Sequence, residues 1–228
     1  AEKIILDGLA THFPGDAILS EESGRSQAAV PQSSSSQPSK TWVIDPIDGT
    51  SDYSKGRDGY SVMIGLMIGS DPIMGVVYQP AWNRCYWGSK NNGAWLLTDS
   101  NAVTPLTTTT SDLHQLKLAS SRSNRNNNLL GMIEKLPIAK DTQIGSVGVK
   151  AGLIANREAD VYITDSHCHY WDTVAPQAIL EAAGGVFSHL DGSVIQYSLE
   201  EQTRHPLGLL GCSSLQVHAF ALSKLKED

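Results

Sequence analysis

The ten residues Thr41–Thr50, T-W-V-I-D-P-I-D-G-T, constrain the fold and chemistry of this chain more than any other stretch. The first four are apolar or β-branched and predict a short buried strand. Pro46 fixes φ and has no amide donor, so we expect the strand to stop and turn there. The carboxylates of Asp45 and Asp48 would then lie at the edge of a sheet. Carboxylates bind hard cations such as Mg²⁺, and the Gly-Thr pair that follows offers backbone N–H groups to phosphate oxygens. The stretch therefore indicates a metal-assisted phosphate site rather than a plain acidic turn.

Composition excludes several classes of protein. The chain has 228 residues, of which 40% are hydrophobic and 18% charged, which suits a soluble globular protein of one large domain or two compact halves. A formal charge of −7 argues against non-specific nucleic-acid binding, and no apolar run approaches the length of a membrane span. Three scattered cysteines predict reduced thiols in a cytoplasmic protein rather than a disulfide framework. We expect a monomer or homodimer that binds neither nucleic acid nor membranes.

The N-terminal part of the chain, residues 1–114, has the pattern of an antiparallel sheet with helices. An amphipathic helix is predicted over Ala1–Thr11 and a short strand over Ala17–Leu19. Two hairpins are predicted from the β-rich runs Tyr60–Gly69, Ile73–Gln79, Arg84–Gly88 and Ala94–Leu97, followed by a polar connector over Thr104–Asp112. The stretch Ser23–Lys40 is rich in Ser, Gln and Pro, which predicts a mobile surface loop, with a lid over the site as the alternative.

The C-terminal part, residues 115–228, alternates between strand and helix patterns, which predicts an α/β layer. Strands are expected at Lys117–Ser120, Thr142–Ile144, Val161–Ile163, Val186–Ser188 and Leu207–Leu210. Helices are expected at Asn127–Lys135, Val147–Asn156, Asp172–Ala183 and Leu215–Leu225.

Three segments, in this chain order, resemble the signature of the inositol monophosphatase superfamily of Mg²⁺-dependent phosphatases. They are Ile18–Ser23, Thr41–Thr50, and Trp171–Pro176 running on to Gly184-Gly185. Three motifs in the right order are more specific than any one of them, and the resemblance extends from Ala1 to about Ser214. It implies a layered αβαβα sandwich of stacked helices and sheets.

The resemblance also implies a set of metal ligands. Glu21 and Asp45 would hold one Mg²⁺ together with the backbone carbonyl of Ile47, while Asp45, Asp48 and Asp172 would hold a second. Hydrolysis of a phosphate monoester needs charge neutralisation, an activated water and a stabilised leaving oxygen, and Mg²⁺ held by ionised oxygens can supply all three. Asp172 also stands where a helix is expected to begin, so an N-cap role is the alternative for this residue.

Further roles follow from the same resemblance. Gly49 and Thr50 would hold the scissile phosphate with backbone amides, and the Thr50 hydroxyl would help to activate the attacking water. In the family, that hydroxyl pairs with an Asp that precedes the Glu21 motif, and no acid upstream of Glu21 has the matching setting. We therefore expect that an N-terminal segment before Ala1 is missing, and that the chain alone would turn over substrate weakly or not at all.

The segments Ser120–Ser123 and Gly145–Lys150, together with Trp171–Pro176, favour one group within the superfamily. They resemble 3′(2′),5′-bisphosphate nucleotidases, which remove the 3′-phosphate from adenosine 3′,5′-bisphosphate. The resemblance implies a lithium-sensitive enzyme of sulfur metabolism that hydrolyses this nucleotide. It also implies that the 5′-phosphosulfate analogue of the nucleotide is a further substrate.

A substrate with two phosphates needs a second anion site away from the metals. Arg122 and Lys150 are suitable cations for it, with ordinary surface charge as the alternative for both, and Ser146 is a weaker candidate. The motif His167-Cys168-His169 lacks the usual spacing of zinc ligands and is better explained as a loop near the site.

Two other functions stay open on the sequence alone. One is an inositol or sugar phosphatase built on the same metal site. The other is a metal-binding scaffold without turnover, which the expected loss of an N-terminal segment would explain.

Overall fold

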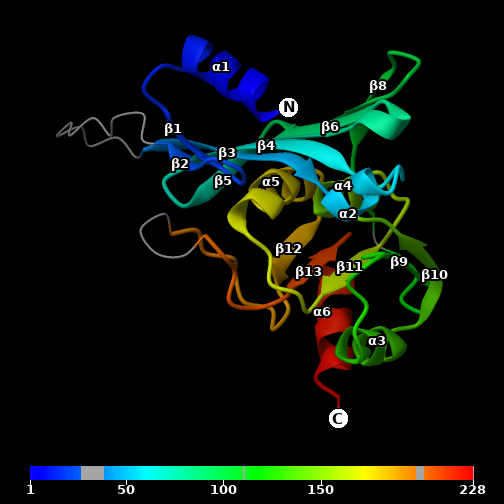
Figure 1. The fold of residues 1–228 in the computed structure, drawn as a ribbon. Helices are drawn as coiled ribbons and strands as arrows, with labels where there is room; N and C mark the ends of the chain where they lie inside the picture. The colour runs from blue at the N-terminus through cyan, green and yellow to red at the C-terminus, as the bar shows by residue number, and fades with distance from the viewer. Residues whose placement is uncertain (27–38, 110, 199–202, 228) are drawn as a thin grey trace.

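Helices and sheets alternate in five layers in the computed structural model of this chain (Figure 1). The structure describes residues 1–26, 39–109, 111–198 and 203–227, and the predicted loop or lid over Ser23–Lys40 lies largely outside them. From one side to the other, the layers are helix α1 (Glu2–His12), an eight-stranded sheet, helices α4 (Val147–Ala155) and α5 (Val174–Ala182), a five-stranded sheet, and helices α3 (Asn127–Glu134) and α6 (Leu215–Leu225). The αβαβα sandwich expected from the sequence is confirmed.

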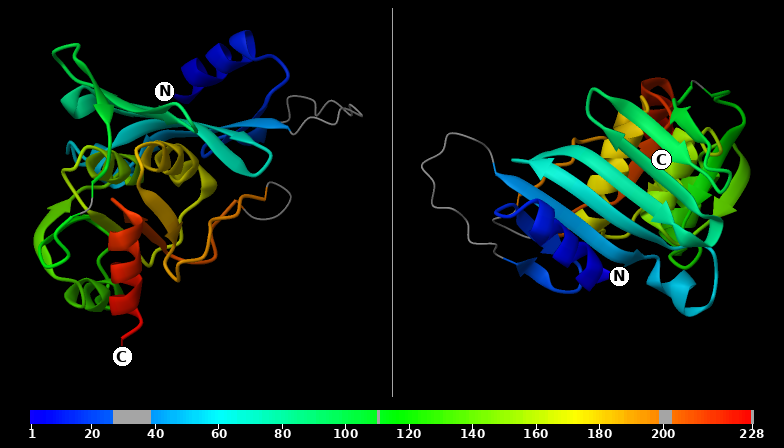
Figure 2. Two further views of the ribbon diagram at one scale, coloured as in Figure 1. Left: turned by 180° about the vertical axis from the view of Figure 1, so that it is seen from behind. Right: turned by 90° about the horizontal axis from the view of Figure 1, so that it is seen from above.

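The first sheet is built from the N-terminal half of the chain. Its strand order is β2(Gly24–Ser26), β1(Ala17–Ser20), β3(Lys40–Asp48), β4(Ser61–Ile68), β5(Asp71–Gln79), β6(Arg84–Ser89), β7(Gly93–Leu97) and β8(Val103–Leu106). All neighbours are antiparallel except β1 and β3, which run parallel and therefore end at the same edge. Helix α1 (Glu2–His12) lies across the outer face of this sheet (Figure 2). Its buried residue Leu9 belongs to one hydrophobic cluster with Trp42 and Ile44 of β3.

The second sheet carries the C-terminal half. Its order is β10(Ile138–Gln143), β9(Leu116–Ser120), β11(Val161–Thr164), β13(Leu209–Cys212) and β12(Val186–His189). Helices α3 (Asn127–Glu134) and α6 (Leu215–Leu225) cover its outer face, where Leu129 and Val217 are fully buried.

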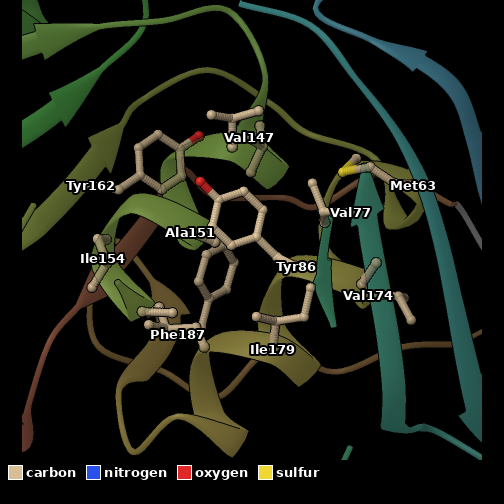
Figure 3. Close-up of a cluster of buried hydrophobic side chains, with 14 of the residues drawn as sticks. Met63, Val77, Tyr86, Val147, Ala151, Ile154, Tyr162, Val174, Ile179 and Phe187 are labelled. Atoms are coloured by element: carbon tan, nitrogen blue, oxygen red, sulfur yellow. The ribbon is translucent and has the colours of Figure 1, made fainter. Parts of the chain in front are cut away.

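Helices α4 (Val147–Ala155) and α5 (Val174–Ala182) lie between the two sheets and form the centre of the core. All nine residues of α4 are buried, because the helix is covered on every side. Figure 3 shows how Met63 and Tyr86 from the first sheet meet α4 and α5, and how Tyr162 and Phe187 from the second sheet meet them from the other side. One hydrophobic cluster thus joins both halves of the chain.

The predicted helices and most predicted strands are present. The bounds of β10 and β13 differ from the strands predicted at Thr142–Ile144 and Leu207–Leu210, and two further differences have physical reasons. Pro46 does not end its strand: β3 continues to Asp48, because the ladder to β4 shifts register between Asp45 and Asp48, where the missing donor costs no hydrogen bond. The prediction of a polar connector over Thr104–Asp112 was also wrong at its start. Strand β8 (Val103–Leu106) pairs with β7 there and forms the edge of the sheet.

Helix α5 approaches the first sheet so closely at β5 that only glycine fits. A Cβ on Gly75 would lie 2.2 Å from the carbonyl oxygen of Ala175. Substitution of Gly75 by Ala should therefore destabilise the fold by roughly 1–3 kcal/mol, as other overpacked cores do. Urea unfolding monitored by circular dichroism measures the change.

Gly131 is the matched control, because it lies within helix α3 and a Cβ there meets no atom within 4 Å. Gly131→Ala should be neutral or stabilising by up to about 1 kcal/mol. Equal effects of the two substitutions would contradict the packing described for α5.

Candidate active site

Three aspartates from distant parts of the sequence meet at one end of the central helical layer. Each of Asp45, Asp48 and Asp172 offers a carboxylate oxygen, and these oxygens all lie within 4.8 Å of one another. Asp45 and Asp48 end strand β3, whereas Asp172 ends the short 3₁₀ helix η2 (Tyr170–Asp172). In the described part of the chain this is the one group of three potential metal-ligating side chains at such spacing. The convergence predicted for these aspartates is therefore observed.

Glu21 reaches the same place from the neighbouring strand. Its backbone N–H donates to Ile44 O at 3.1 Å, because β1 and β3 are parallel and in register up to Ser20 and Ile44. The Glu21 carboxylate lies close enough to Asp45 for its charge to raise the pKa of Asp45. Both acidic segments therefore deliver their carboxylates to one edge of the first sheet.

A local break in β3 brings Asp45 and Asp48 to the same side. In a regular strand, residues three apart point to opposite faces of the sheet. Here Asp45 Oδ1 accepts the backbone N–H of Ile47 at 2.9 Å, and the register shift between the two aspartates inserts an irregular turn at Pro46. The proline thus re-aims a carboxylate instead of ending the strand.

Asp48 is held by the beginning of helix α4. Its Oδ2 accepts Ser146 Oγ at 2.6 Å and the backbone N–H of Gly148 at 3.1 Å. Ser146 is the N-cap of α4, and its hydroxyl also accepts the N–H of Val149 at 3.0 Å. Because the Ser146 proton is committed to Asp48, the 2.8 Å contact with Ser61 Oγ places Ser61 as the donor. The helix terminus and its cap fix one carboxylate oxygen of the cluster.

Burial is the largest cause of the raised pKa values in the cluster, and repulsion between carboxylates adds to it for Asp45 and Asp172. Burial, followed by the charges of Asp48 and Glu21, raises the pKa of Asp45. Burial and the charge of Asp48 raise the pKa of Asp172 to about 7. The pKa of Asp48 is also raised by burial, although the charge of Lys150 and the hydrogen bond from Ser146 oppose this. Asp45 and Asp48 are buried and Asp172 is partly buried. Such an all-oxygen set of like charges suits a hard divalent cation, so these residues fit the metal that the sequence implies.

Lys150 is placed differently from what the sequence led us to expect. Its side chain lies in α4 and the residue is only 1% exposed, so the surface-charge alternative is wrong. The ammonium donates to Gly145 O at 2.7 Å and lies 5.1 Å from the ring centroid of Tyr162. It contributes positive charge behind Asp48 and is not presented to solvent as an anion ligand.

The Gly49-Thr50 pair leads directly from Asp48 into helix α2 (Thr50–Ser54). Gly49 has φ of +88°, and a Cβ there would lie 2.7 Å from Gly59 O and 3.1 Å from Ser146 N, so only glycine fits. Thr50 is exposed at the first residue of α2, beside the carboxylates. The short helical turn expected here is present, and its phosphate-binding role stays a prediction.

The N-cap role considered for Asp172 is wrong for the following helix, because Thr173 holds that position. Asp172 is instead the last residue of η2. Its Oδ2 caps the beginning of that helix by accepting the backbone N–H of His169 at 2.6 Å. Neighbouring Tyr170 is buried, and its hydroxyl accepts the N–H of Ser198 at 3.0 Å. Trp171 is partly buried and stacks on His169, with ring centroids 4.4 Å apart.

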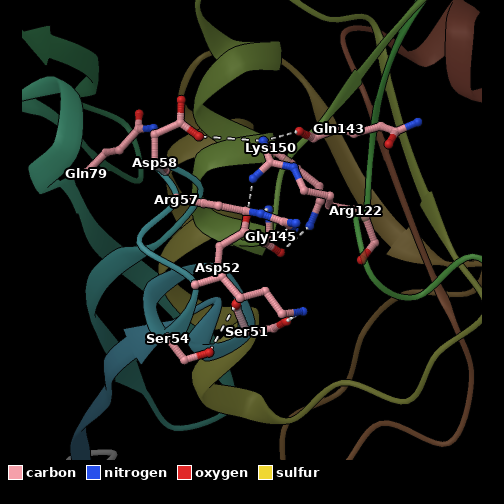
Figure 4. Close-up of polar contacts among 12 residues, drawn as sticks. Ser51, Asp52, Ser54, Arg57, Asp58, Gln79, Arg122, Gln143, Gly145 and Lys150 are labelled. Carbon is pink, nitrogen blue, oxygen red and sulfur yellow. Dashed lines mark hydrogen bonds and ion pairs between the residues drawn. The ribbon is translucent and has the colours of Figure 1, made fainter.

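Arg122 lies on the loop that follows β9, and its guanidinium contacts two carboxylates. Nη1 is 2.7 Å from Asp52 Oδ2, and Nη2 is 3.5 Å from Asp58 Oδ1 (Figure 4). The Asp52 and Asp58 carboxylates were not singled out from the sequence. They stand in a polar turn where nothing but their charge distinguishes them from ordinary surface residues.

Comparison with known proteins decides the family. The chain matches the model of the inositol monophosphatase family over residues 1–225. It belongs to the inositol monophosphatase family. The members of this family are metal-dependent phosphatases of small phosphate esters, and the carboxylate cluster described above could bind such a metal.

Relatives with two different substrate names are similar to this chain. The 3′(2′),5′-bisphosphate nucleotidase CysQ of Buchnera aphidicola is 31% identical over 89% of this chain and 73% of its own length. The inositol monophosphatase of Mesembryanthemum crystallinum is 29% identical over 81% of this chain and 68% of its own length. Because the two identities are so close, they show the family and not the substrate.

Solved structures agree on the fold. The inositol monophosphatase from Anabaena superposes with a TM-score of 0.78 at 24% identity, covering 100% of this chain and 85% of that one. SuhB of Mycobacterium tuberculosis superposes with a TM-score of 0.76 at 26% identity, covering 99% of this chain and 81% of that one. None of the helices in the described part of the chain has both the length and the apolar character needed to cross a bilayer.

The raised pKa of Asp172 predicts how stability depends on pH without divalent cations. The folded state keeps this proton up to about pH 7, whereas an unfolded Asp loses it near pH 4. The contribution to stability is therefore complete below about pH 4 and is lost as pH rises through about 7. We expect Asp172→Asn, which cannot ionise, to gain stability relative to the native protein between pH 5 and pH 8 in EDTA.

Urea unfolding of both proteins at the two pH values measures this difference. Excess Mg²⁺ should stabilise the native protein more at pH 8 than at pH 5, because protons and metal compete for the same oxygens. A difference in stability between native and variant that does not change with pH would show that the pKa of Asp172 is not raised in the folded protein.

Proposed function

We propose that this protein is a Mg²⁺-dependent phosphatase that removes the 3′-phosphate from adenosine 3′,5′-bisphosphate, and that it also accepts the 5′-phosphosulfate analogue. The observation that carries the catalytic part is the convergence of Asp45, Asp48 and Asp172 within 4.8 Å. The nucleotide part is supported by CysQ relatives from several bacteria at 28–31% identity. The segments Ser120–Ser123 and Gly145–Lys150 also resemble that group.

Five residues would hold the metal ions: Glu21, Asp45, Asp48 and Asp172 through carboxylates and Ile47 through its carbonyl. When bound, Mg²⁺ would neutralise phosphate charge and lower the pKa of the attacking water. The chain itself keeps the ligands in place. Ser146 and the N-terminus of α4 orient Asp48, and the His169 amide orients Asp172.

The chain also supplies the groups that would hold the substrate. In this proposal the backbone N–H groups of Gly49 and Thr50 bind the scissile phosphate, and the Thr50 hydroxyl orients the attacking water. Ser146 contributes to substrate binding only indirectly, because its hydroxyl donates its hydrogen bond to Asp48. Lys150 adds positive charge from within the core, which favours an anionic substrate at the same end of α4.

A second candidate is an inositol monophosphatase, which the relatives named inositol monophosphatase at 29% identity support. A substrate panel separates the two. With Mg²⁺, adenosine 3′,5′-bisphosphate should give the highest kcat/KM for phosphate release, above inositol monophosphate and fructose bisphosphate, and Li⁺ should inhibit the reaction.

Inositol monophosphate as the best substrate would end the nucleotidase proposal. Bound Mg²⁺ without phosphate release from any of the three esters would instead favour the metal-binding scaffold. The comparison should be run at one pH and one Mg²⁺ concentration, so that only the ester changes.

Substitution of Asp48 by Asn should abolish turnover and weaken Mg²⁺ binding while the fold is kept. Asn preserves the size of the side chain and can still accept the hydrogen bonds from Ser146 and Gly148, so the loss would come from the missing charge. Phosphate release, calorimetric Mg²⁺ titration and circular dichroism measure the three effects.

Asp7→Asn is the control, because Asp7 is an exposed residue of α1 whose carboxylate pairs only with Lys3 among the residues described. It should leave both turnover and Mg²⁺ affinity unchanged. Retained activity in Asp48→Asn would remove Asp48 from the metal site.

A further inference from the structure

Asp52 is a buried carboxylate that the catalytic scheme does not use. It lies in α2, two residues after Thr50, and is 1% exposed. Its Oδ2 accepts Nη1 of Arg122 at 2.7 Å and the backbone N–H of Gly145 at 3.0 Å (Figure 4). Its Oδ1 lies 3.6 Å from Nη1 of Arg57. One carboxylate therefore connects three separate segments of the chain.

The surrounding backbone is shaped around this carboxylate. A Cβ on Gly59 would lie 2.0 Å from Asp52 Oδ2, and a Cβ on Gly145 would lie 2.9 Å from it. Both glycines thus leave room for the Asp52 side chain. No side chain could be added at either position without displacing Asp52 from its partners.

Arg122 is bound from several sides. Besides Asp52, its Nη2 donates to Gln143 O at 2.9 Å and lies 3.5 Å from Asp58 Oδ1. Its side chain is 26% exposed. A second substrate phosphate could bind this guanidinium only by displacing the buried Asp52 carboxylate. That carboxylate would then be left without its ion-pair partner, which is energetically unfavourable.

The Asp52 carboxylate that Arg122 binds also joins the two segments that build the active site, because it accepts the backbone N–H of Gly145. One is α2, whose first residue Thr50 follows Gly49 and Asp48 directly. The other is the Gly145-Ser146 turn, which caps α4 and donates to Asp48 at 2.6 Å. The backbone N–H of Ser146 also donates to the carbonyl oxygen of Gly59, in the loop that follows α2, at 2.8 Å. A second hydrogen bond therefore links this part of the chain to the Ser146 turn.

We propose that the Asp52–Arg122 ion pair positions the Gly49-Thr50 turn against the Ser146 turn, and that Arg122 is not a ligand of the substrate's second phosphate. Arg122 and Asp52 are positioning residues, since neither touches the metal-ligating carboxylates. This inference rests on the proposed function for the identity of the turn as a phosphate site. It revises the role expected for Arg122 from the sequence.

The experiment compares Asp52→Asn, Arg122→Met and the double variant on two substrates, adenosine 3′,5′-bisphosphate and adenosine 3′-monophosphate. If the pair positions the site, both single variants lower kcat by a similar factor of about tenfold or more on both substrates, as misplaced catalytic groups do. The double variant is then no worse than either single one. The ratio of kcat/KM between the two substrates stays as in the native protein.

A different pattern overturns the inference. If Arg122→Met raises KM for the bisphosphate alone while Asp52→Asn does not, Arg122 is a phosphate ligand. If neither single variant changes kcat, the pair serves only the fold. Calorimetric Mg²⁺ affinity should change less than twofold in all variants, because the metal ligands are untouched. Arg122→Lys keeps a charge and should restore part of the lost kcat, and it serves as the second variant if Arg122→Met does not fold.

Arg125→Met is the matched control. Arg125 lies on the same loop, is 23% exposed and pairs with Asp141 at 2.8 Å, but the pair does not reach α2. It should leave kcat unchanged.

Should the native protein release no phosphate from adenosine bisphosphate, the proposed function fails separately. The ion pair is then tested by calorimetric binding of inorganic phosphate in Mg²⁺, which both single variants should weaken and Arg125→Met should not.

Discussion

Repulsion between buried carboxylates is the constraint on which the rest of this structure depends. Asp45, Asp48 and Asp172 are brought together although burial raises the pKa of each, and the charge of Asp48 raises the pKa of Asp45 and of Asp172 further. Such an arrangement is costly for an isolated protein and becomes favourable once a divalent cation neutralises it. The fold supplies what the cluster needs before the metal binds: a helix terminus, a serine cap and a buried lysine, all at the beginning of α4.

The layers of the fold explain why these residues meet. Strands β1 and β3 are parallel neighbours, so Glu21 and Asp45 leave the first sheet at one edge. Helices α4 and α5 lie between the sheets, and the segments that precede them supply Ser146 and Asp172 at that edge. The hydrophobic cluster around Tyr86 and Ile179 fixes the helices against both sheets. Packing in the core therefore sets the separation of charges at the site.

Much of this could be predicted from the sequence, because the motifs are local and each element has a strong pattern. The convergence of Asp45, Asp48 and Asp172 was predicted through motifs that stand near the ends of strands and helices, whereas the role of Thr50 stays a prediction. The bulge at Pro46 could not be predicted, since a proline stops a strand or shifts its register according to the neighbouring strand. The burial of Lys150 was missed for a similar reason, because α4 is apolar on all sides only once two sheets cover it.

The ion pair of Asp52 and Arg122 marks the limit of sequence reasoning at this site. The two residues stand 70 positions apart, and each is an ordinary charge in its own segment. Only the folded chain brings Arg122 to Asp52, whose carboxylate also binds the Gly145 amide beside the Ser146 turn. A similar limit applies to substrate choice, since relatives named as a nucleotidase and as an inositol monophosphatase match this chain at 31% and 29% identity.

The central claim is that the buried carboxylates form a divalent metal site. Anomalous diffraction from crystals of the protein soaked in Mn²⁺, which takes the same oxygen ligands as Mg²⁺, tests it most directly. We predict anomalous peaks between Asp45, Asp48 and Asp172, with Glu21 as a further ligand. Mn²⁺ bound elsewhere in the molecule, with no peak among these side chains, would contradict it.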